Sequence, residues 1–134
     1  MKIDPYLHFN GNCAEAITLY EKAFNTKVAH VMKYGDAPAE DGYEIPAGQE
    51  NFIGHATLPV GETELMLCDA PDEAHRFGTG VSLHVSLDSA TDVNAAFAIL
   101  KDGGTVLQEL QSTFWSEHFG IVTDKFGVHW MLSV

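Results

Sequence analysis

Cysteine and basic residues are scarce in this chain of 134 residues. Its two cysteines, Cys13 and Cys68, are too few and too scattered for a disulfide framework or a zinc knuckle, so we expect reduced thiols in a cytoplasmic protein. Only 7 Lys and Arg residues stand against 19 Asp and Glu residues, which gives a net charge of −12. Because this charge would repel a phosphate backbone, we expect no nucleic-acid partner.

Long apolar runs are also missing. No stretch reaches the roughly 18 apolar residues of a membrane-spanning helix. The N-terminal MKIDPYLHFN lacks the apolar segment and cleavage site of a signal peptide, so we expect no membrane partner. Apolar residues nevertheless make up 46% of the chain, which is enough for the core of one domain.

The first half of the sequence predicts the order strand, helix and three strands. The run YLHF indicates a strand, and Asn12 followed three residues later by Glu15 is typical of a helix capping box. The rest of this half is predicted as a β-rich run at 26–35, a long loop at 36–51 and a hairpin that turns near Gly61.

The second half predicts the same order. VSLHVSLDS, residues 81–89, alternates so that Val81, Leu83, Val85 and Leu87 share one face of a strand and His84 lies on the other. A helix that begins near Ser89 or Thr91 and ends before Gly103 and Gly104, a strand within 105–115 and a closing hairpin at 118–134 are expected to follow.

Two short matches suggest that the halves are repeats. LHF at 7–9 matches LHV at 83–85, and LML at 65–67 matches WML at 130–132. In an alternating strand, Leu7 and Phe9 would face the helix, so His8 must face the other side. The same holds for His84, and we predict that both histidines line a cavity that the halves share.

Longer motifs resemble a known family. The opening YLHFNGNCAEAITLYEKAF and the closing TFWSEHFGIVTDKFGVHWML are similar to the PhnB-like branch of the vicinal oxygen chelate superfamily, which includes glyoxalase I, bleomycin-resistance proteins and extradiol dioxygenases. The resemblance implies an α+β fold in which two βαβββ modules form mixed sheets that curl around one cavity, within a homodimer. We place the modules at 1–70 and 78–134, with a linker at 71–77.

The resemblance also raises the question of a divalent metal. Metal-using relatives place one ligand on the first strand and one on the last strand of each module. By position, the first-strand candidates are His8 and His84, whereas Met66 and Met131 stand where the last-strand ligands would be. Because a thioether is a poor ligand for hard or borderline divalent ions, the set is incomplete.

Two functions remain open. The first is a protein that binds a small apolar or aromatic molecule in its cavity without metal chemistry; the second is a divalent-metal-dependent lyase, isomerase or dioxygenase. No glycine-rich strand–turn–helix motif supports the methyltransferase name that members of this branch often carry. We expect His30, His75 and His118 to be solvated or loop residues. The predicted cavity residues are His8, His55, Met66, His84, Trp115, His129 and Met131.

Overall fold

The chain forms two compact units, Met1–His75 and Arg76–Val134. The computed structural model describes residues 1–36, 45–71 and 75–134. The predicted loop at 36–51 and the predicted linker at 71–77 therefore lie partly outside the described residues. Within the described ranges, no helix is both long enough and apolar enough to cross a membrane.

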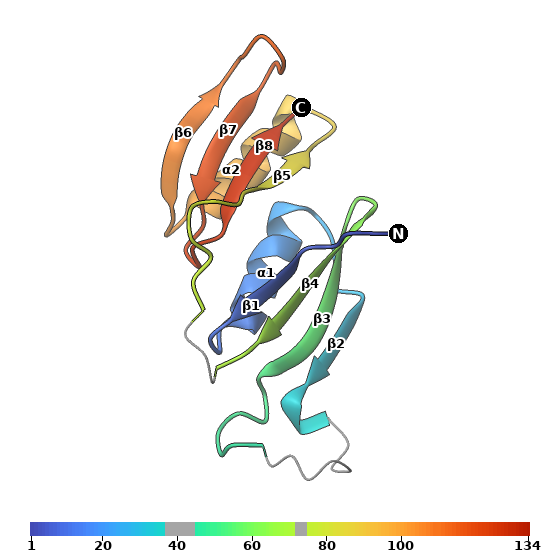
Figure 1. Ribbon diagram of the computed structural model, residues 1–134. Helices are drawn as coiled ribbons and strands as arrows, with labels where there is room; N and C mark the ends of the chain where they lie inside the picture. The colour runs from blue at the N-terminus through green and yellow to red at the C-terminus, as the bar shows by residue number, and fades with distance from the viewer. Residues whose placement is uncertain (37–44, 72–74) are drawn as a thin grey trace. The chain divides into compact units, whose positions relative to one another are not determined.

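The first unit follows the predicted order of strand, helix and three strands (Figure 1). Its sheet has the strand order β1-β4-β3-β2 and is mixed, because β1 runs parallel to β4 while the other neighbours are antiparallel. Gly61 adopts a φ of 59° in the tight turn between β3 and β4, a conformation that favours glycine. The elements are β1 (Tyr6–Phe9), α1 (Cys13–Ala23), β2 (His30–Lys33), a 3-10 turn η1 (Tyr34–Asp36), β3 (Ile53–Val60) and β4 (Thr63–Asp69).

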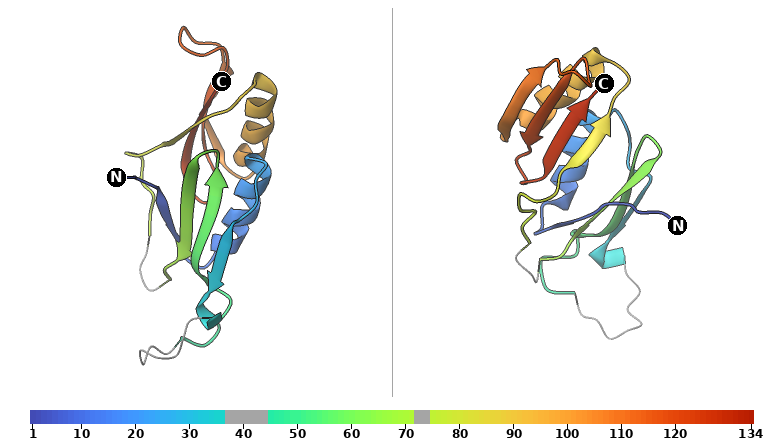
Figure 2. Two further views of the ribbon diagram at one scale, coloured as in Figure 1. Left: turned by 90° about the vertical axis from the view of Figure 1, so that its right-hand side faces the viewer. Right: turned by 45° about the horizontal axis from the view of Figure 1, so that its top comes forward.

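The core of the first unit lies between its sheet and α1. Alternate side chains of β1, Leu7 and Phe9, are buried, as the sequence predicts. They share one face of the sheet with Leu58 of β3 and Leu67 of β4, which are fully buried. Figure 2 shows α1 on one face of this sheet. The opposite face is consequently free for polar and aromatic side chains.

The start of α1 is held by a residue that the capping pattern did not identify. Asn12 occupies the position before the helix, but its side chain makes no capping hydrogen bond, so the predicted capping box with Glu15 is wrong. Asp69, at the end of β4, accepts hydrogen bonds from the backbone N–H groups of Gly11 at 2.8 Å and Cys13 at 3.0 Å. A buried carboxylate from a distant strand therefore satisfies the first N–H groups of the helix.

The second unit repeats the βαβββ order. Its sheet has the strand order β5-β8-β7-β6, with β5 parallel to β8 and the other neighbours antiparallel. The two units are thus the two βαβββ modules of an α+β fold with mixed sheets, as predicted. The elements are β5 (Leu83–Ser86), α2 (Ala90–Lys101), β6 (Thr105–Gln111), β7 (Phe119–Thr123) and β8 (His129–Ser133).

Details of the second unit refine the predicted boundaries. Strand β5 begins only at Leu83, and Val81, which was expected to face the core, is 69% exposed. The predicted helix start is confirmed, because the Ser89 hydroxyl accepts a hydrogen bond from the backbone N–H of Asp92 at 3.1 Å. The core includes the buried Trp130 of β8 and Phe97 of α2, and Figure 2 shows α2 on one face of this sheet.

Candidate functional site

The face of the first sheet opposite α1 carries polar and aromatic side chains from all four strands, including one histidine from each of β1, β2 and β3, and we call it the histidine face. Register places its members side by side: Tyr6 and Thr57 each lie opposite Met66, and His30 lies opposite Thr57. Each of them alternates along its strand with residues that face the helix. The histidine face comprises Tyr6 and His8 of β1, His30 and Met32 of β2, His55 and Thr57 of β3, and Met66 and Cys68 of β4.

Tyr6 lies at the centre of a chain of ring contacts on the histidine face. Its ring centroid is 5.1 Å from that of His8 and 5.6 Å from that of His55. His55 lies 6.0 Å from His30, and His8 lies 5.4 Å from His75. All four pairs are tilted at distances typical of attractive aromatic contacts. One phenol and four imidazoles therefore form a continuous aromatic surface.

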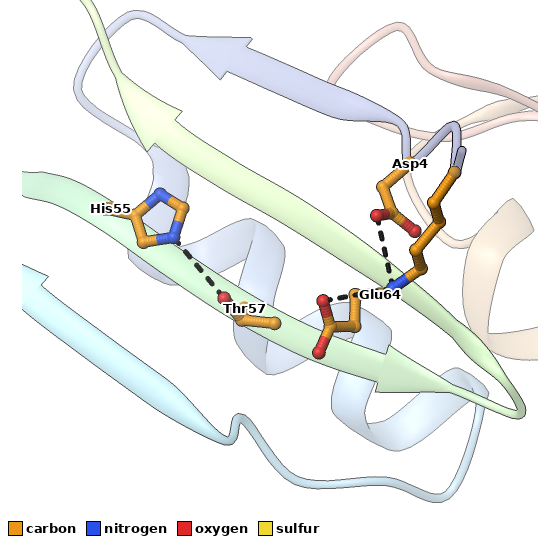
Figure 3. Close-up of polar contacts among 5 residues, drawn as sticks. Asp4, His55, Thr57 and Glu64 are labelled. Atoms are coloured by element: carbon orange, nitrogen blue, oxygen red, sulfur yellow. Dashed lines mark hydrogen bonds and ion pairs between the residues drawn. The ribbon is translucent and has the colours of Figure 1, made fainter.

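Hydrogen bonds run through the same surface. The Tyr6 hydroxyl lies 2.9 Å from His55 Nδ1, and the Thr57 hydroxyl lies 3.4 Å from His55 Nε2. Figure 3 shows His55 and Thr57 on β3 with the second of these contacts drawn. The second contact is long for a hydrogen bond to nitrogen, so it is the weaker of the two. The imidazole of His55 is thus positioned on both sides.

Two histidines that were expected to be solvated or loop residues belong to this surface. His30 is exposed, but it begins β2 and contacts the ring of His55. His75 lies outside the strands, where its Nε2 forms a hydrogen bond of 2.9 Å with the carbonyl oxygen of Ala70. The expectation of a solvated side chain holds for His30, although its strand also places it on the histidine face. His118 does lie in a loop, where its Nε2 is 2.7 Å from Asn94 Oδ1.

Burial favours the protonated forms of the Tyr6 phenol and the Cys68 thiol on the histidine face. Partial burial raises the pKa of Tyr6 to about 12, and the neighbouring thiol of Cys68 adds to the effect. Burial likewise raises the pKa of the Cys68 thiol, although a hydrogen bond from Tyr6 opposes this shift. A raised thiol pKa is the reverse of what a nucleophilic cysteine needs. Tyr6 and Cys68 are therefore neutral groups at physiological pH.

The face of the second sheet opposite α2 carries three further predicted site residues, His84, His129 and Met131. His84 of β5 lies opposite Met131 of β8, and its Nε2 is 2.8 Å from the Ser133 hydroxyl. His129 Nδ1 forms a short hydrogen bond with the Thr123 hydroxyl of the neighbouring strand β7. His129 alternates along β8 with the buried Trp130, and His84 alternates along β5 with Leu83 and Val85, as the sequence predicts for this face.

Trp115 lies in the connection between β6 and β7 rather than on a strand. Its side chain is 51% exposed, and its ring packs edge-on against Phe119 of β7 with centroids 4.4 Å apart. The structure thus brings His8, His55 and Met66 together in one unit and His84, His129 and Met131 together in the other. That these two groups line one cavity stays a prediction.

The strand register corrects the predicted correspondence between the halves. His84 lies opposite Met131, but His8 lies opposite Cys68 and not opposite Met66, which pairs with Tyr6. The match of LHF to LHV and the match of LML to WML therefore disagree with each other by two residues. A shift of two residues keeps every side chain on the same face, so the alternating pattern could not reveal it.

The donor atoms beside the candidate metal ligands do not suit a divalent metal ion. His8 is paired with the protonated thiol of Cys68, and His84 is paired with the thioether of Met131. Enzymes that use hard or borderline ions need carboxylate or further imidazole ligands at such positions. Among the described residues, no group of three or more His, Cys, Asp or Glu side chains is arranged to hold a metal.

Comparison with known proteins places the chain in a family. The model of the Glyoxalase/Bleomycin resistance protein/Dioxygenase superfamily matches residues 2–132. Protein YjdN of Escherichia coli is 32% identical over 140 residues, covering 100% of this chain and 95% of YjdN. The solved structure of protein PA1353 from Pseudomonas aeruginosa is 36% identical, has a TM-score of 0.85, and covers 99% of this chain and 96% of that one.

A second solved structure narrows the family to a branch. A PhnB protein from Bacillus cereus is 28% identical to this chain, with a TM-score of 0.79, and the match covers 99% of this chain and 98% of that one. The fold and the paired modules of this chain agree with these matches. The chain belongs to the Glyoxalase/Bleomycin resistance protein/Dioxygenase superfamily, in its PhnB-like branch.

Proposed function

We propose that this protein binds a small apolar or aromatic molecule, without a complete metal site, at the histidine face and the corresponding face of the second sheet. The observation that carries the proposal is the continuous contact of Tyr6 with His8 and His55, extended by His30. Tyr6 is 40% exposed, so its ring is open to a ligand. Flat rings of this kind stack on planar ligands and bury apolar area.

Methionine side chains support the same proposal. Three of the four methionines of the chain, Met32, Met66 and Met131, lie on the faces opposite the helices, and the fourth is Met1. A thioether on a flexible side chain adapts its shape to different ligands and contacts aromatic rings favourably. Methionines beside imidazoles thus suit the binding of apolar ligands better than the binding of a hard metal ion.

A divalent-metal-dependent lyase, isomerase or dioxygenase is the second candidate. Its supporting observation is that His8 and His84 each lie on the first strand of a unit, and that this strand runs parallel to the last strand of the same unit. Ligands other than Cys68 and Met131 would have to complete the coordination of the metal. Membership of the superfamily alone does not decide between the two candidates, because one fold hosts many functions.

The methionines provide a direct binding assay. Protein labelled with ¹³C at the methionine methyl groups would be titrated with small aromatic probes such as indole and acetophenone. We expect the methyl resonances of Met32, Met66 and Met131 to shift in a saturable way, while Met1, which is fully exposed, serves as the internal control. If none of these three resonances shifts at the highest probe concentration, the result contradicts the proposal.

A second arm of the experiment separates the two candidates. Protein purified without a histidine tag would be analysed for bound metals, and its melting temperature would be measured with and without Zn²⁺, Ni²⁺, Mn²⁺ and Fe²⁺. We expect no stoichiometric metal and no change in melting temperature. Stoichiometric metal that is lost in both His8→Ala and His84→Ala would favour the enzyme instead, whereas the surface variant His118→Ala controls for adventitious binding.

Assembly is part of the proposal as well. The family resemblance implies a homodimer, and the sparse cysteines favour a cytoplasmic protein. Sedimentation velocity at several protein concentrations would test the first expectation, since a stable dimer sediments with a mass twice 14.6 kDa. A single species of 14.6 kDa at all concentrations would contradict it.

A further inference from the structure

We infer that Tyr6, positioned by His55 and Thr57, forms a subsite that recognises a carbonyl oxygen on an aromatic ligand. The inference rests on the proposed binding function and names the ligand class that the histidine face would select. It starts from the hydrogen-bonded chain in which the Tyr6 hydroxyl lies 2.9 Å from His55 Nδ1 and the Thr57 hydroxyl lies 3.4 Å from His55 Nε2.

This chain can run in either direction. A phenol and an alcohol can each donate or accept, and a neutral imidazole carries its proton on one nitrogen and accepts at the other. In the first direction, Tyr6 donates to His55 Nδ1 and His55 Nε2–H donates to Thr57. In the second, Thr57 donates to Nε2 and Nδ1–H donates to the Tyr6 oxygen. Only the second direction frees the phenol proton of Tyr6 from His55, so that it can turn from the neighbouring Cys68 thiol toward a ligand.

A carbonyl oxygen would select the second direction. It is a hydrogen-bond acceptor and carries no proton, so it bonds to Tyr6 only when the phenol proton points toward the ligand. The long contact between Thr57 and His55 makes reversal inexpensive, because little hydrogen-bond energy is lost while the chain rearranges. No net proton is taken up, since each group in the chain passes one hydrogen bond to the next.

The surroundings of Tyr6 fit this role. Tyr6 is 40% exposed, so part of the residue is open to a ligand. Burial keeps the phenol protonated, because it raises the Tyr6 pKa to about 12, and Tyr6 therefore remains a donor at physiological pH. The rings of His8 and His55 lie within 5.1 and 5.6 Å of the Tyr6 ring and provide stacking surface beside the donor. A planar ring with an attached carbonyl matches both features.

A matched pair of probes tests the inference. Acetophenone and ethylbenzene have nearly the same shape, but only acetophenone carries a carbonyl oxygen. Affinities would be taken from the methionine methyl shifts of the labelled protein. We expect acetophenone to bind roughly five-fold more tightly than ethylbenzene, as one neutral hydrogen bond provides. In Tyr6→Phe, which keeps the ring but lacks the hydroxyl, we expect the two affinities to become equal.

Two controls make the result specific. Tyr34→Phe also removes a phenol hydroxyl from the first unit, but that hydroxyl is bonded to the carbonyl oxygen of Asp69. This variant should keep the preference for acetophenone. Thr57→Val should reduce the preference without abolishing it, because Thr57 acts only through His55.

A spectroscopic readout reports the direction of the chain. ¹⁵N chemical shifts distinguish the two tautomers of His55, and they would be recorded in mildly alkaline buffer, in which an ordinary imidazole is neutral. We expect acetophenone, but not ethylbenzene, to move His55 from the Nε2–H form toward the Nδ1–H form. A purely structural role for Tyr6 would not produce this change.

The outcomes separate this inference from the proposed function. Equal binding of both probes to the wild-type protein would overturn the inference and leave the proposed function standing. A preference for acetophenone that survives in Tyr6→Phe would also overturn the inference. Binding of neither probe would overturn both.

Discussion

At the scale of single residues, the phenol of Tyr6 predicts how the protein responds to alkaline pH. Its pKa is raised from the ordinary 10.0 to about 12, chiefly because partial burial disfavours the charged phenolate. The folded protein therefore holds this proton more tightly than the unfolded chain does. The contribution to stability is complete below about pH 10 and is lost as the pH rises toward 12.

Absorbance of tyrosinate in the near ultraviolet measures this titration. The chain has four tyrosines, so the wild-type curve is a sum of several components. We expect Tyr6→Phe to lose the component that titrates near pH 12, and Tyr34→Phe to retain it. The stability of Tyr6→Phe should also fall less steeply than that of the wild type above pH 10. Loss of a component near pH 10 in Tyr6→Phe would contradict the raised pKa.

At the scale of elements, the two helices begin in different ways, although each follows the first strand of its unit. The hydroxyl of Ser89 caps α2 by accepting a hydrogen bond from the backbone N–H of Asp92. The side chain of Asn12 makes no such bond at the start of α1, where the carboxylate of Asp69 accepts from the backbone instead. The two positions therefore differ in how much a side chain contributes.

Alanine substitutions measure this difference. We expect Ser89→Ala to lower the free energy of unfolding by about 1 kcal/mol, because the capping bond is lost. We expect Asn12→Ala to change it by only a few tenths of a kcal/mol, since no capping bond exists to lose. Urea unfolding of the two variants provides the measurement, provided that the free energy of unfolding falls with urea concentration at the same slope in both. A larger loss in Asn12→Ala than in Ser89→Ala would show that Asn12 caps α1 in solution.

The same elements show what a sequence can and cannot predict. Alternation along strands correctly assigns His8 and His84 to the faces opposite the helices, because the side-chain period of a strand is two. It cannot detect the two-residue disagreement between the matches LHF with LHV and LML with WML, since both registers present the same faces. The order of the elements, the turn at Gly61 and the cap at Ser89 depend on local patterns and were predicted.

Contacts between distant residues were the ones that the sequence did not reveal. Asp69 caps α1 from a strand 56 residues beyond Cys13, and no local motif marks that partnership. The Tyr6–His55 pair joins residues 49 positions apart. The β-rich run that contains His30 was predicted, but its contact with the His55 ring, 25 positions away, was not. The pairing of Tyr6 with Met66 points to the histidine face only once the strand register is known.

At the scale of the whole molecule, the dominant electrostatic feature is the net charge of −12. Self-repulsion among so many like charges destabilises the compact state. Attractive pairs offset it little: in the described part of the chain, the ion pairs are those of the exposed Lys2 with Asp4 at 3.2 Å and Glu64 at 3.3 Å (Figure 3). Because the Lys2 side chain is exposed and its charge is screened by solvent, these pairs contribute little to stability.

Salt should therefore stabilise this protein. Raising KCl from about 0.01 M to 0.15 M shortens the screening length from about 30 Å to 8 Å, which weakens the long-range repulsion more than it weakens the pairs at Lys2. We expect the melting temperature to rise by about 2 to 5 °C over this range, corresponding to roughly 1 kcal/mol. Calorimetry at fixed pH would measure the rise. The variant Lys2→Gln, which increases the net negative charge, should show a rise at least as large, and a melting temperature that falls with KCl would mean that attractive pairs outweigh the repulsion.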